Sequence, residues 1–395
     1  TRVTKDLISG GNQVYKNVLV SLGESEFHRP DKKTMEQMLR NPWKGSFFSE
    51  RLWKDMGKLE RNLNGVVSLG ISTGKTVTEM AVQLSNVMNR SFNDTHRLVR
   101  TETINYLNRS AKMGYEKAGI PTARYHLVTT LSEAKKFIRQ VGYPVIVKPD
   151  SGVGASDTWK IQDEAQLKSF FCNLPEVPYV MEEFVPGEIC SYDAIVNSKG
   201  SVLFETGNIS PISIMDCVNK HETIHFYIVD KLAEDLRACG RACVKAFRVR
   251  SRFVHLEFFR LFTDHPYLGK KGQIVGLEVN MRPSGGPTPD MINFAYSTNC
   301  YQHFADMIVY DKLKHKNKAT PCFCAFVGRW NELCYKHSHE EIMTAFRGEL
   351  TTAEALPEVL AQGMGNYIYL AKLENKEKME EFFQYTLELE EKERI

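Results

Sequence analysis

Three polar side chains interrupt the otherwise apolar run IVGLEVNMRPSGG, which spans Ile274 to Gly286. Glu278, Asn280 and Arg282 stand two positions apart, so in a β-strand all three would project from one face. Burying such groups without partners costs several kcal/mol. Mg²⁺ prefers oxygen ligands and is typically held by one or two carboxylates together with waters and substrate phosphates. The run therefore predicts a magnesium site with a guanidinium nearby for a phosphate; a salt-bridged strand edge is the alternative.

A second acidic strand is predicted in the run FVHLEFFR, where Glu257 stands between apolar neighbours. A lone glutamate in a strand is usually turned to solvent, but beside the first run it would supply a second carboxylate for one or two metal ions. His255 lies two positions earlier and would share the same strand face. For this histidine a structural role near the carboxylate is favoured over catalysis.

A phosphate-binding element is predicted where the apolar run YPVIVKP delivers Lys148 and continues into a loop with Gly152 and Gly154. Glycines without a Cβ let backbone N–H groups surround phosphate oxygens, and a lysine at a strand end adds a point charge. A strand, a lysine and a glycine-rich loop in this order indicate phosphate binding more strongly than the loop alone.

The run PYVMEEFVPGEICSYDAIV indicates a hinge strand over residues 179–185, with Glu188 after a Pro-Gly turn. Backbone groups of such a strand can hold a nucleotide base, and a carboxylate after a turn can accept hydrogen bonds from both ribose hydroxyls. Simple acidity of an edge strand is the alternative interpretation.

The elements that must position these residues change in character near residue 119. The first 118 residues show the apolar spacing of amphipathic helices, as in residues 77–88 after Thr76. Beyond Pro121, short β-branched runs alternate with helical patterns at residues 131–140 and 229–247, which indicates an α/β or α+β core. A basic loop near residue 311 then leads into a smaller mixed tail that ends in a charged helix.

The stretch GISTGKT, residues 70–76, resembles a phosphate-binding P-loop but fails its spacing. Three residues, rather than four, separate the first glycine from the Gly-Lys pair, and no apolar strand precedes it. A turn with Thr76 at the start of a helix is the better interpretation.

The composition is that of a globular protein, since 395 residues with 42% hydrophobic side chains can build two or three cores. The first 120 residues carry 19 Lys and Arg against 12 Asp and Glu, an excess that marks a solvated face more often than an acidic partner. The nine cysteines lack CxxC spacing, and no apolar run approaches the length of about 18 residues that a membrane span needs. We therefore expect a cytoplasmic protein in a reducing compartment, with no membrane contact.

Taken together, the runs AGIPTARY, VIVKPDSGVGAS, MEEFVPGE, HLEFF and LEVNMRPSGG resemble the blocks of the ATP-grasp family in their order and rough spacing. The similarity is greatest to carbamoyl-phosphate-synthase-like and biotin-carboxylase-like members. It covers residues 119–310 as an ATP-grasp domain, with residues 311–395 as a C-terminal α+β extension. The resemblance implies the ATP-grasp fold, an α+β fold in which two lobes hold ATP between them.

The resemblance also implies roles for individual residues. Lys148 would contact the phosphates of ATP and act in catalysis, and Arg282 would contact the phosphoryl group during transfer. Magnesium or manganese would be bound by Glu257, Glu278 and Asn280. ATP would be held by Lys148, Gly152, Gly154, Ser156, Glu182, Glu183, Val185, Glu188 and Arg109.

The reaction that the resemblance implies is phosphorylation of a small-molecule carboxylate by ATP, followed by attack of an amine or another nucleophile on the acyl phosphate. Phosphoryl transfer asks a protein mainly for positioning and charge neutralisation, which cationic side chains and metal ligands supply. The sequence identifies neither the carboxylate nor the nucleophile. It also leaves open the number of metal ions and whether the chain forms a homo-oligomer.

Residues 1–118 depart from the ATP-grasp pattern, in which a small α/β domain precedes the first block. Instead, the runs NPWKGSFFSERLWKD, GISTGKTVTEMAVQL and RLVRTETINYLNRSA are similar to the helical core of phage minor head proteins. The alternative function is a head morphogenesis protein that contacts a capsid or portal through residues 1–118 and carries a passenger or inactive ATP-grasp domain. The missing α/β domain also leaves open an impaired ligase activity.

Overall fold

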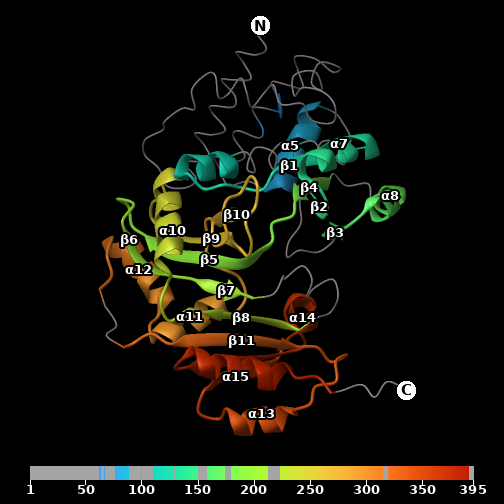
Figure 1. Ribbon diagram of the computed structural model, residues 1–395. Helices are drawn as coiled ribbons and strands as arrows, with labels where there is room; N and C mark the ends of the chain where they lie inside the picture. Colours follow the sequence, from blue (N-terminus) through green and yellow to red (C-terminus); the bar gives the residue numbers. More distant parts are fainter. Residues whose placement is uncertain are drawn as a thin grey trace, which may run out of the picture.

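The computed structural model of the chain describes residues 62–63, 66, 76–88, 99, 110–128, 130–149, 158–173, 179–211, 223–314 and 319–390. These residues form two β-sheets, one of four strands and one of nine, with helices packed against both (Figure 1). We call the four-stranded sheet with its helices the small lobe, and the nine-stranded sheet with its helices the large lobe. Among the described helices, none is long and apolar enough to cross a lipid bilayer.

The small lobe is an antiparallel sheet in the order β1-β4-β2-β3. Alternation along the strands sends Val145, Val147 and Met181 into a core that also contains side chains of two helices. The opposite face of the sheet carries Lys148 and Glu182, away from those helices. The elements of this lobe are β1 Tyr125–Val128, α7 Leu131–Val141, β2 Val145–Pro149, β3 Trp159–Ile161, α8 Glu164–Cys172 and β4 Tyr179–Glu183.

Local sequence signals fix the ends of α7. The Thr130 hydroxyl caps the first turn by accepting the backbone N–H of Glu133. Gly142 ends the helix with a φ of 81°, a conformation that glycine adopts without the strain of a Cβ. The helix therefore delivers the chain into β2, which carries Lys148, at a defined point.

The large lobe is built on an antiparallel sheet in the order β10-β9-β5-β7-β8-β11-β13-β12, with β6 paired to β5. Its strands are β5 Gly187–Val196, β6 Val202–Thr206, β7 Asn208–Ser210, β8 Ile224–Ile228, β9 Arg252–Leu261, β10 Ile274–Asn280, β11 Phe323–Arg329, β12 Leu350–Ala355 and β13 Tyr367–Leu373.

Helices cover both faces of the large sheet. On one face, α10 packs against Cys190, Tyr192 and Phe258. On the opposite face, α11 and α12 cover Ile195 and Phe253. The other helices of the structure are α5 Val77–Met88, α10 Glu234–Ala246, α11 Thr288–Tyr296, α12 Cys300–Tyr310, α13 His339–Ala345, α14 Glu358–Met364 and α15 Lys376–Leu387.

The α+β class predicted from the sequence is confirmed, because the short β-branched runs form strands and the predicted helical runs form α7 and α10. Residues after 311 continue the large sheet, since β11 pairs with β8 along five register positions from Cys324 to Gly328. The predicted C-terminal extension is thus part of the same sheet as the acidic strands.

The region before residue 119 is described only in part. Thr76 starts α5 as predicted, with its hydroxyl accepting the Glu79 N–H and the Glu79 carboxylate accepting the Thr76 N–H. Residues 110–118 are helical, and Tyr115 joins the core of the large lobe. Most of the runs that resemble phage head proteins lie outside the described residues, so that resemblance stays a prediction.

Candidate metal and nucleotide site

Two neighbouring strands bring the predicted metal ligands together. In the β9–β10 ladder Glu278 is the register partner of Glu257, and Asn280 is the partner of His255. Directly paired residues of an antiparallel ladder project from the same face. Two carboxylates and one amide therefore share one surface, which we call the carboxylate face.

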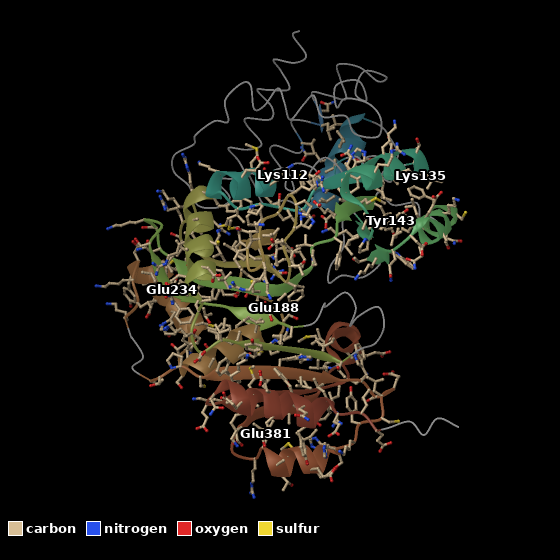
Figure 2. All side chains as sticks on the ribbon, viewed as in Figure 1. Lys112, Lys135, Tyr143, Glu188, Glu234 and Glu381 are labelled. Carbon is tan, nitrogen blue, oxygen red and sulfur yellow. The ribbon has the colours of Figure 1, made fainter. Side chains whose placement is uncertain are left out.

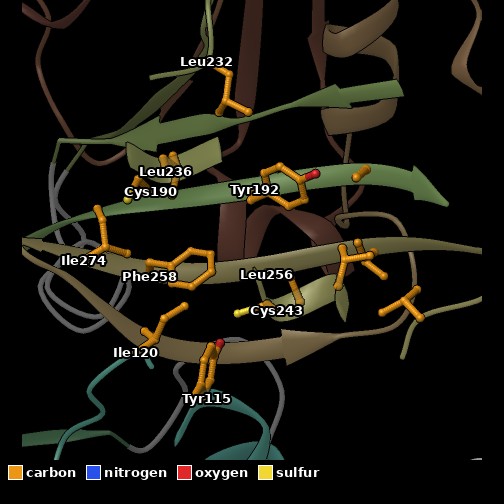
Figure 3. Packing of buried hydrophobic residues seen from close by; sticks show 14 of the residues in the cluster. Tyr115, Ile120, Cys190, Tyr192, Leu232, Leu236, Cys243, Leu256, Phe258 and Ile274 are labelled. Carbon is orange, nitrogen blue, oxygen red and sulfur yellow. The ribbon is translucent and has the colours of Figure 1, made fainter. Parts of the chain in front are cut away.

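A buried tyrosine holds the backbone of these two strands. The Tyr115 hydroxyl donates to the carbonyl oxygen of Glu278 at 2.9 Å and lies 3.3 Å from that of Glu257. Figure 3 shows Tyr115 reaching from its helix toward the large sheet. Gly276 accommodates the ring, because a Cβ at this position would lie 2.8 Å from the Tyr115 ring atoms. The helix that ends at residue 118 thus fixes the spacing between the two acidic strands.

Like charge accumulates on the carboxylate face. Burial among protein atoms raises the pKa of Glu278, and the neighbouring Glu257 carboxylate raises it further. A hydrogen bond from Asn280 and the positive charges of Lys148 and His255 oppose this rise. The Glu278 side chain nevertheless remains exposed to solvent. A carboxylate that is surrounded by protein and still reaches water is suited to receive a cation.

A buried polar chain leads away from Glu257 into the large lobe. His255 places Nε2 2.9 Å from Glu257 Oε1 and Nδ1 2.8 Å from Asp193 Oδ1. Burial by itself would lower the pKa of His255, but the two carboxylates overcome that effect and raise it to about 10. The Ser191 hydroxyl donates to the other Asp193 oxygen. His255 thus lies on the predicted face and is a doubly hydrogen-bonded cation at neutral pH.

The small lobe contributes cations from the face opposite its helices. Lys148 Nζ lies 2.8 Å from Glu182 Oε2, and both side chains are partly exposed. Lys160 in β3 shares this face, since its register partner Ile146 is also the partner of Glu182. Its ammonium group lies 4.1 Å from the centre of the Phe184 ring. Two lysines therefore accompany the hinge on this surface of the small lobe.

We call residues 182–188, at the end of β4 and just beyond it, the hinge segment. Several of its predicted nucleotide-binding side chains form contacts within the protein. Glu183 is 3% exposed and forms a two-pronged ion pair with Arg124. His265 of the β9–β10 connection approaches the same carboxylate at 3.4 Å. Burial would raise the pKa of Glu183, but the Arg124 hydrogen bonds hold it below its ordinary value. Val185 is buried in a small apolar cluster of the large lobe.

Glu188 lies apart from the other predicted ligands. It pairs in register with Arg260, and Ser191, three residues further along β5, pairs with Glu257. Strand alternation therefore puts Glu188 on the face of α10, opposite to the carboxylate face. Burial raises the pKa of Glu188, and the charges of Arg260 and Lys376 oppose that rise. Figure 2 labels Glu188 on the large lobe.

Strand geometry does not bring Arg282 to the carboxylate face. β10 ends at Asn280, so Arg282 follows in an irregular segment, where its exposed guanidinium donates to the Pro283 carbonyl at 2.9 Å. The expectation that Arg282 continues the strand is therefore wrong, because the chain leaves the ladder before it. Arg109, Gly152, Gly154 and Ser156 lie outside the described residues.

The donor set fits magnesium or manganese. Glu257, Glu278 and Asn280 offer only oxygen donors once the Asn280 carbonyl turns to an ion, as hard cations require. No group of three or more His, Cys, Asp or Glu side chains within the described part of the chain could hold a metal by itself. The set is thus incomplete as a protein cage, and it suits an ion that brings phosphate and water ligands of its own.

The sequence alone did not single out Tyr115, Lys160, Ser191 or Asp193. A signal existed for Asp193, because an isolated carboxylate inside the apolar run SYDAIV needs a partner when buried. Ser191 lies two residues earlier, the same spacing that links His255 to Glu257. Tyr115 gave no signal, since its role depends on a contact across more than a hundred residues.

Comparisons with known proteins identify the family and the fold that this chain resembles. Residues 116–215 match the ATP-grasp domain. The chain is 33% identical over 93 residues to the mitochondrial arginine-specific carbamoyl phosphate synthase large chain of Schizosaccharomyces pombe, a match that covers 22% of this chain and 8% of that protein. The chain thus spans a small fraction of the length of the curated relatives it matches.

Two solved structures share the fold at low sequence identity. An L-amino acid ligase from Bacillus licheniformis superposes with a TM-score of 0.51 and 16% identity, covering 70% of this chain and 68% of that one. A carboxyaminoimidazole ribonucleotide synthase from Aspergillus clavatus, complexed with ATP, gives 0.50 and 14%, covering 77% of each chain. The chain has the α+β ATP-grasp fold, and the match to the ATP-grasp domain is confined to residues 116–215. Its sequence similarity to carbamoyl phosphate synthase large chains is distant.

Proposed function

We propose that the protein is a Mg²⁺- and ATP-dependent ligase that joins a small-molecule carboxylate to an amine or another nucleophile through an acyl phosphate. The observation that supports this most is the carboxylate face, where Glu257, Glu278 and Asn280 lie together and the charge of Lys148 reaches Glu278. Phosphoryl transfer requires positive charges and metal ligands placed around the phosphates. The ATP-grasp fold adds support, because its neighbours include an L-amino acid ligase.

In this proposal, different residues of the chain bind the metal ion, the phosphates of ATP and the transferred phosphoryl group. Glu257, Glu278 and Asn280 hold the metal ion, which neutralises charge on the phosphates of ATP. Lys148 exchanges its Glu182 partner for a phosphate oxygen, because a phosphate carries more negative charge than one carboxylate. Arg282, on the segment after β10, contacts the phosphoryl group that is transferred.

The base of ATP is bound by the backbone of the hinge in this proposal. The side chains of Glu183 and Val185 are engaged in an ion pair and an apolar cluster, and the Glu183 N–H donates to the Arg124 carbonyl oxygen at 2.9 Å, so the base contacts the peptide group of Val185. Glu182 remains available on the lysine-bearing face. Glu188 is left out of the binding set, since it lies on the opposite face of the large sheet.

Calorimetric titration with ATP, in the presence and absence of Mg²⁺, tests the binding half of the proposal. Lys148→Ala and Glu278→Gln should each weaken Mg²⁺-dependent binding about 100-fold. Lys336→Ala is a matched control, because Lys336 also forms a 2.8 Å ion pair with a glutamate, Glu388, in the C-terminal part. Binding that is indifferent to both site substitutions would refute the assignment.

Carboxylate-dependent release of ADP tests the chemical half. Amino acids form the first panel, both as carboxylates and as amines, because an L-amino acid ligase is among the fold neighbours. ADP release that needs one carboxylate and one nucleophile supports the ligase. Tight ATP binding without release on any panel would reduce the function to nucleotide binding. The phage head alternative has no support among the relatives and structures described above.

A further inference from the structure

Glu257 is held by more than its own strand. One of its oxygens, Oε1, accepts a hydrogen bond from His255 Nε2 at 2.9 Å. The opposite ring nitrogen of His255 donates to Asp193 Oδ1 at 2.8 Å. Asp193 is fully buried and His255 is 5% exposed. The ring is thus held at both ends, by the buried Asp193 carboxylate and by the partly exposed Glu257 carboxylate.

This series of hydrogen bonds continues to the backbone of a third strand, β7. Ser191 donates its hydroxyl to Asp193, and its oxygen accepts the backbone N–H of Asn208 at 3.0 Å. Ser191 and Asp193 lie on β5, which pairs with β9 over ten consecutive register positions. The orientation of Glu257 is therefore tied to three strands of the large sheet. Glu278 has no comparable chain of buried partners among the contacts of the described residues.

We propose that the buried chain Ser191–Asp193–His255 is a positioning device that makes Glu257 a one-oxygen metal ligand and so favours Mg²⁺ or Mn²⁺ over Ca²⁺. The hydrogen bond from His255 occupies one lone pair of Oε1 and weakens that oxygen as a metal donor, which leaves Oε2 as the stronger ligand. Ca²⁺ takes six to eight oxygens and often a two-oxygen carboxylate, whereas Mg²⁺ demands a compact octahedral set. The inference rests on the proposed metal site and adds ion selectivity to it.

The test measures metal binding by the full chain, with no turnover involved. Electron paramagnetic resonance of free Mn²⁺ gives the Mn²⁺ affinity in the presence of a non-hydrolysable ATP analogue, and competition with Ca²⁺ gives the affinity ratio. His255→Gln should weaken Mn²⁺ binding about 10–100-fold, the usual effect of losing a partner behind a metal ligand. The Mn²⁺ to Ca²⁺ ratio should fall about tenfold, because the freed carboxylate can chelate the larger ion.

Two further variants keep the result interpretable. Asp193→Asn retains the side-chain shape but removes the charge behind His255, so it should lower the ratio in the same direction by a smaller factor, and it serves if His255→Gln does not fold. His337→Gln is the control, because His337 also contacts a glutamate, Glu388, at 3.3 Å on another part of the large lobe. This control should leave both affinities at the wild-type values.

The failures of the two proposals are distinguishable. If the wild-type chain binds no Mn²⁺ even with the ATP analogue, the proposed metal site is wrong and this inference falls with it. If the wild type binds Mn²⁺ but folded His255→Gln or Asp193→Asn keeps the wild-type Mn²⁺ to Ca²⁺ ratio, only the positioning role is overturned. A lowered ratio in these variants, with His337→Gln unchanged, supports the role.

Discussion

The β9–β10 pair and the hinge segment 182–188 both carry acidic side chains, but they arrange them in opposite ways. In the pair, Glu257 and Glu278 lie side by side on one face, and the Glu257 carboxylate raises the pKa of Glu278. In the hinge, the acidic side chains are separated from one another, either because they pair with different cations or because they project from different faces. Glu182 meets Lys148, Glu183 meets Arg124, and Glu188 points to the far face of the sheet.

This difference indicates which acidic residues serve ligand binding and which serve the stability of the fold. Acids that occupy paired positions on neighbouring strands concentrate negative charge, and a cation from solution relieves that repulsion. Acids that follow one another along a single strand point alternately to two faces, where different protein cations neutralise them. We therefore expect substitutions in the pair to change metal binding, and substitutions in the hinge to change folding.

The largest expected effect is on metal binding at the pair. Glu278→Gln should weaken Mn²⁺ binding roughly 100-fold or more, because a direct ligand matters more than the outer partners, whose loss costs about 10–100-fold. The metal-free variant should unfold no earlier than the wild type, since the change removes a like charge beside Glu257. Calorimetry and thermal unfolding measure the two quantities. If Glu278→Gln were destabilised but kept the wild-type Mn²⁺ affinity, the β9–β10 pair would serve stability rather than metal binding.

The reverse pattern is expected for the hinge. Glu183→Gln should lower the free energy of unfolding by about 2 kcal/mol, less than the roughly 3–5 kcal/mol of a fully buried pair because Arg124 is partly exposed. The Mn²⁺ affinity should stay at the wild-type value. Denaturant unfolding and Mn²⁺ titration are the measurements, and a metal-binding defect as large as that of Glu278→Gln would remove the distinction.

The pH dependence of stability gives an independent check on Glu183. Its pKa is lowered in the folded protein, so its stabilising contribution is complete above the ordinary glutamate pKa of about 4.3 and is lost as the pH falls through the lowered value. The difference in unfolding free energy between wild type and Glu183→Gln should therefore shrink in acid. A gap that stays constant down to pH 3 would mean that the Arg124 pair contributes little.

A smaller effect is expected where a helix holds the two acidic strands. Tyr115→Phe removes hydrogen bonds to the carbonyl groups of Glu257 and Glu278, and it should cost about 1 kcal/mol of unfolding free energy. Because the strands can then shift slightly, Mn²⁺ affinity should fall several-fold. Gly276→Ala is a sterically opposite change at the same contact, since its Cβ would meet the tyrosine ring at 2.8 Å. Equal affinities in all three proteins would show that this contact does not shape the site.

The smallest effect is expected at Glu188. Glu188→Gln should change ATP affinity by less than about twofold, because the side chain lies on the face of the sheet that carries Arg260 and α10. Calorimetric titration with Mg·ATP measures this affinity. A loss of tenfold or more in ATP affinity would support the ribose contact that the sequence suggested. The nucleotide would then have to reach the α10 face of the large sheet.

The amino-acid sequence by itself determined the α+β class, the acidic strands and the side chains that share their faces. Strand alternation is a local rule, so the spacing of Glu257 from His255, and of Glu278 from Asn280, was enough to predict each pair. The same rule failed at Arg282, because it holds only while the chain stays in the ladder, and the end of β10 is not visible in the spacing.

The tertiary structure decided which groups meet across the fold. The register of β9 against β10 sets Glu257 opposite Glu278, and a slip by one residue would send one of them to the other face. Tyr115 and Asp193 gained their roles through contacts between segments far apart in the chain. Such contacts depend on how sheets and helices pack, and local periodicity carries no information about that packing.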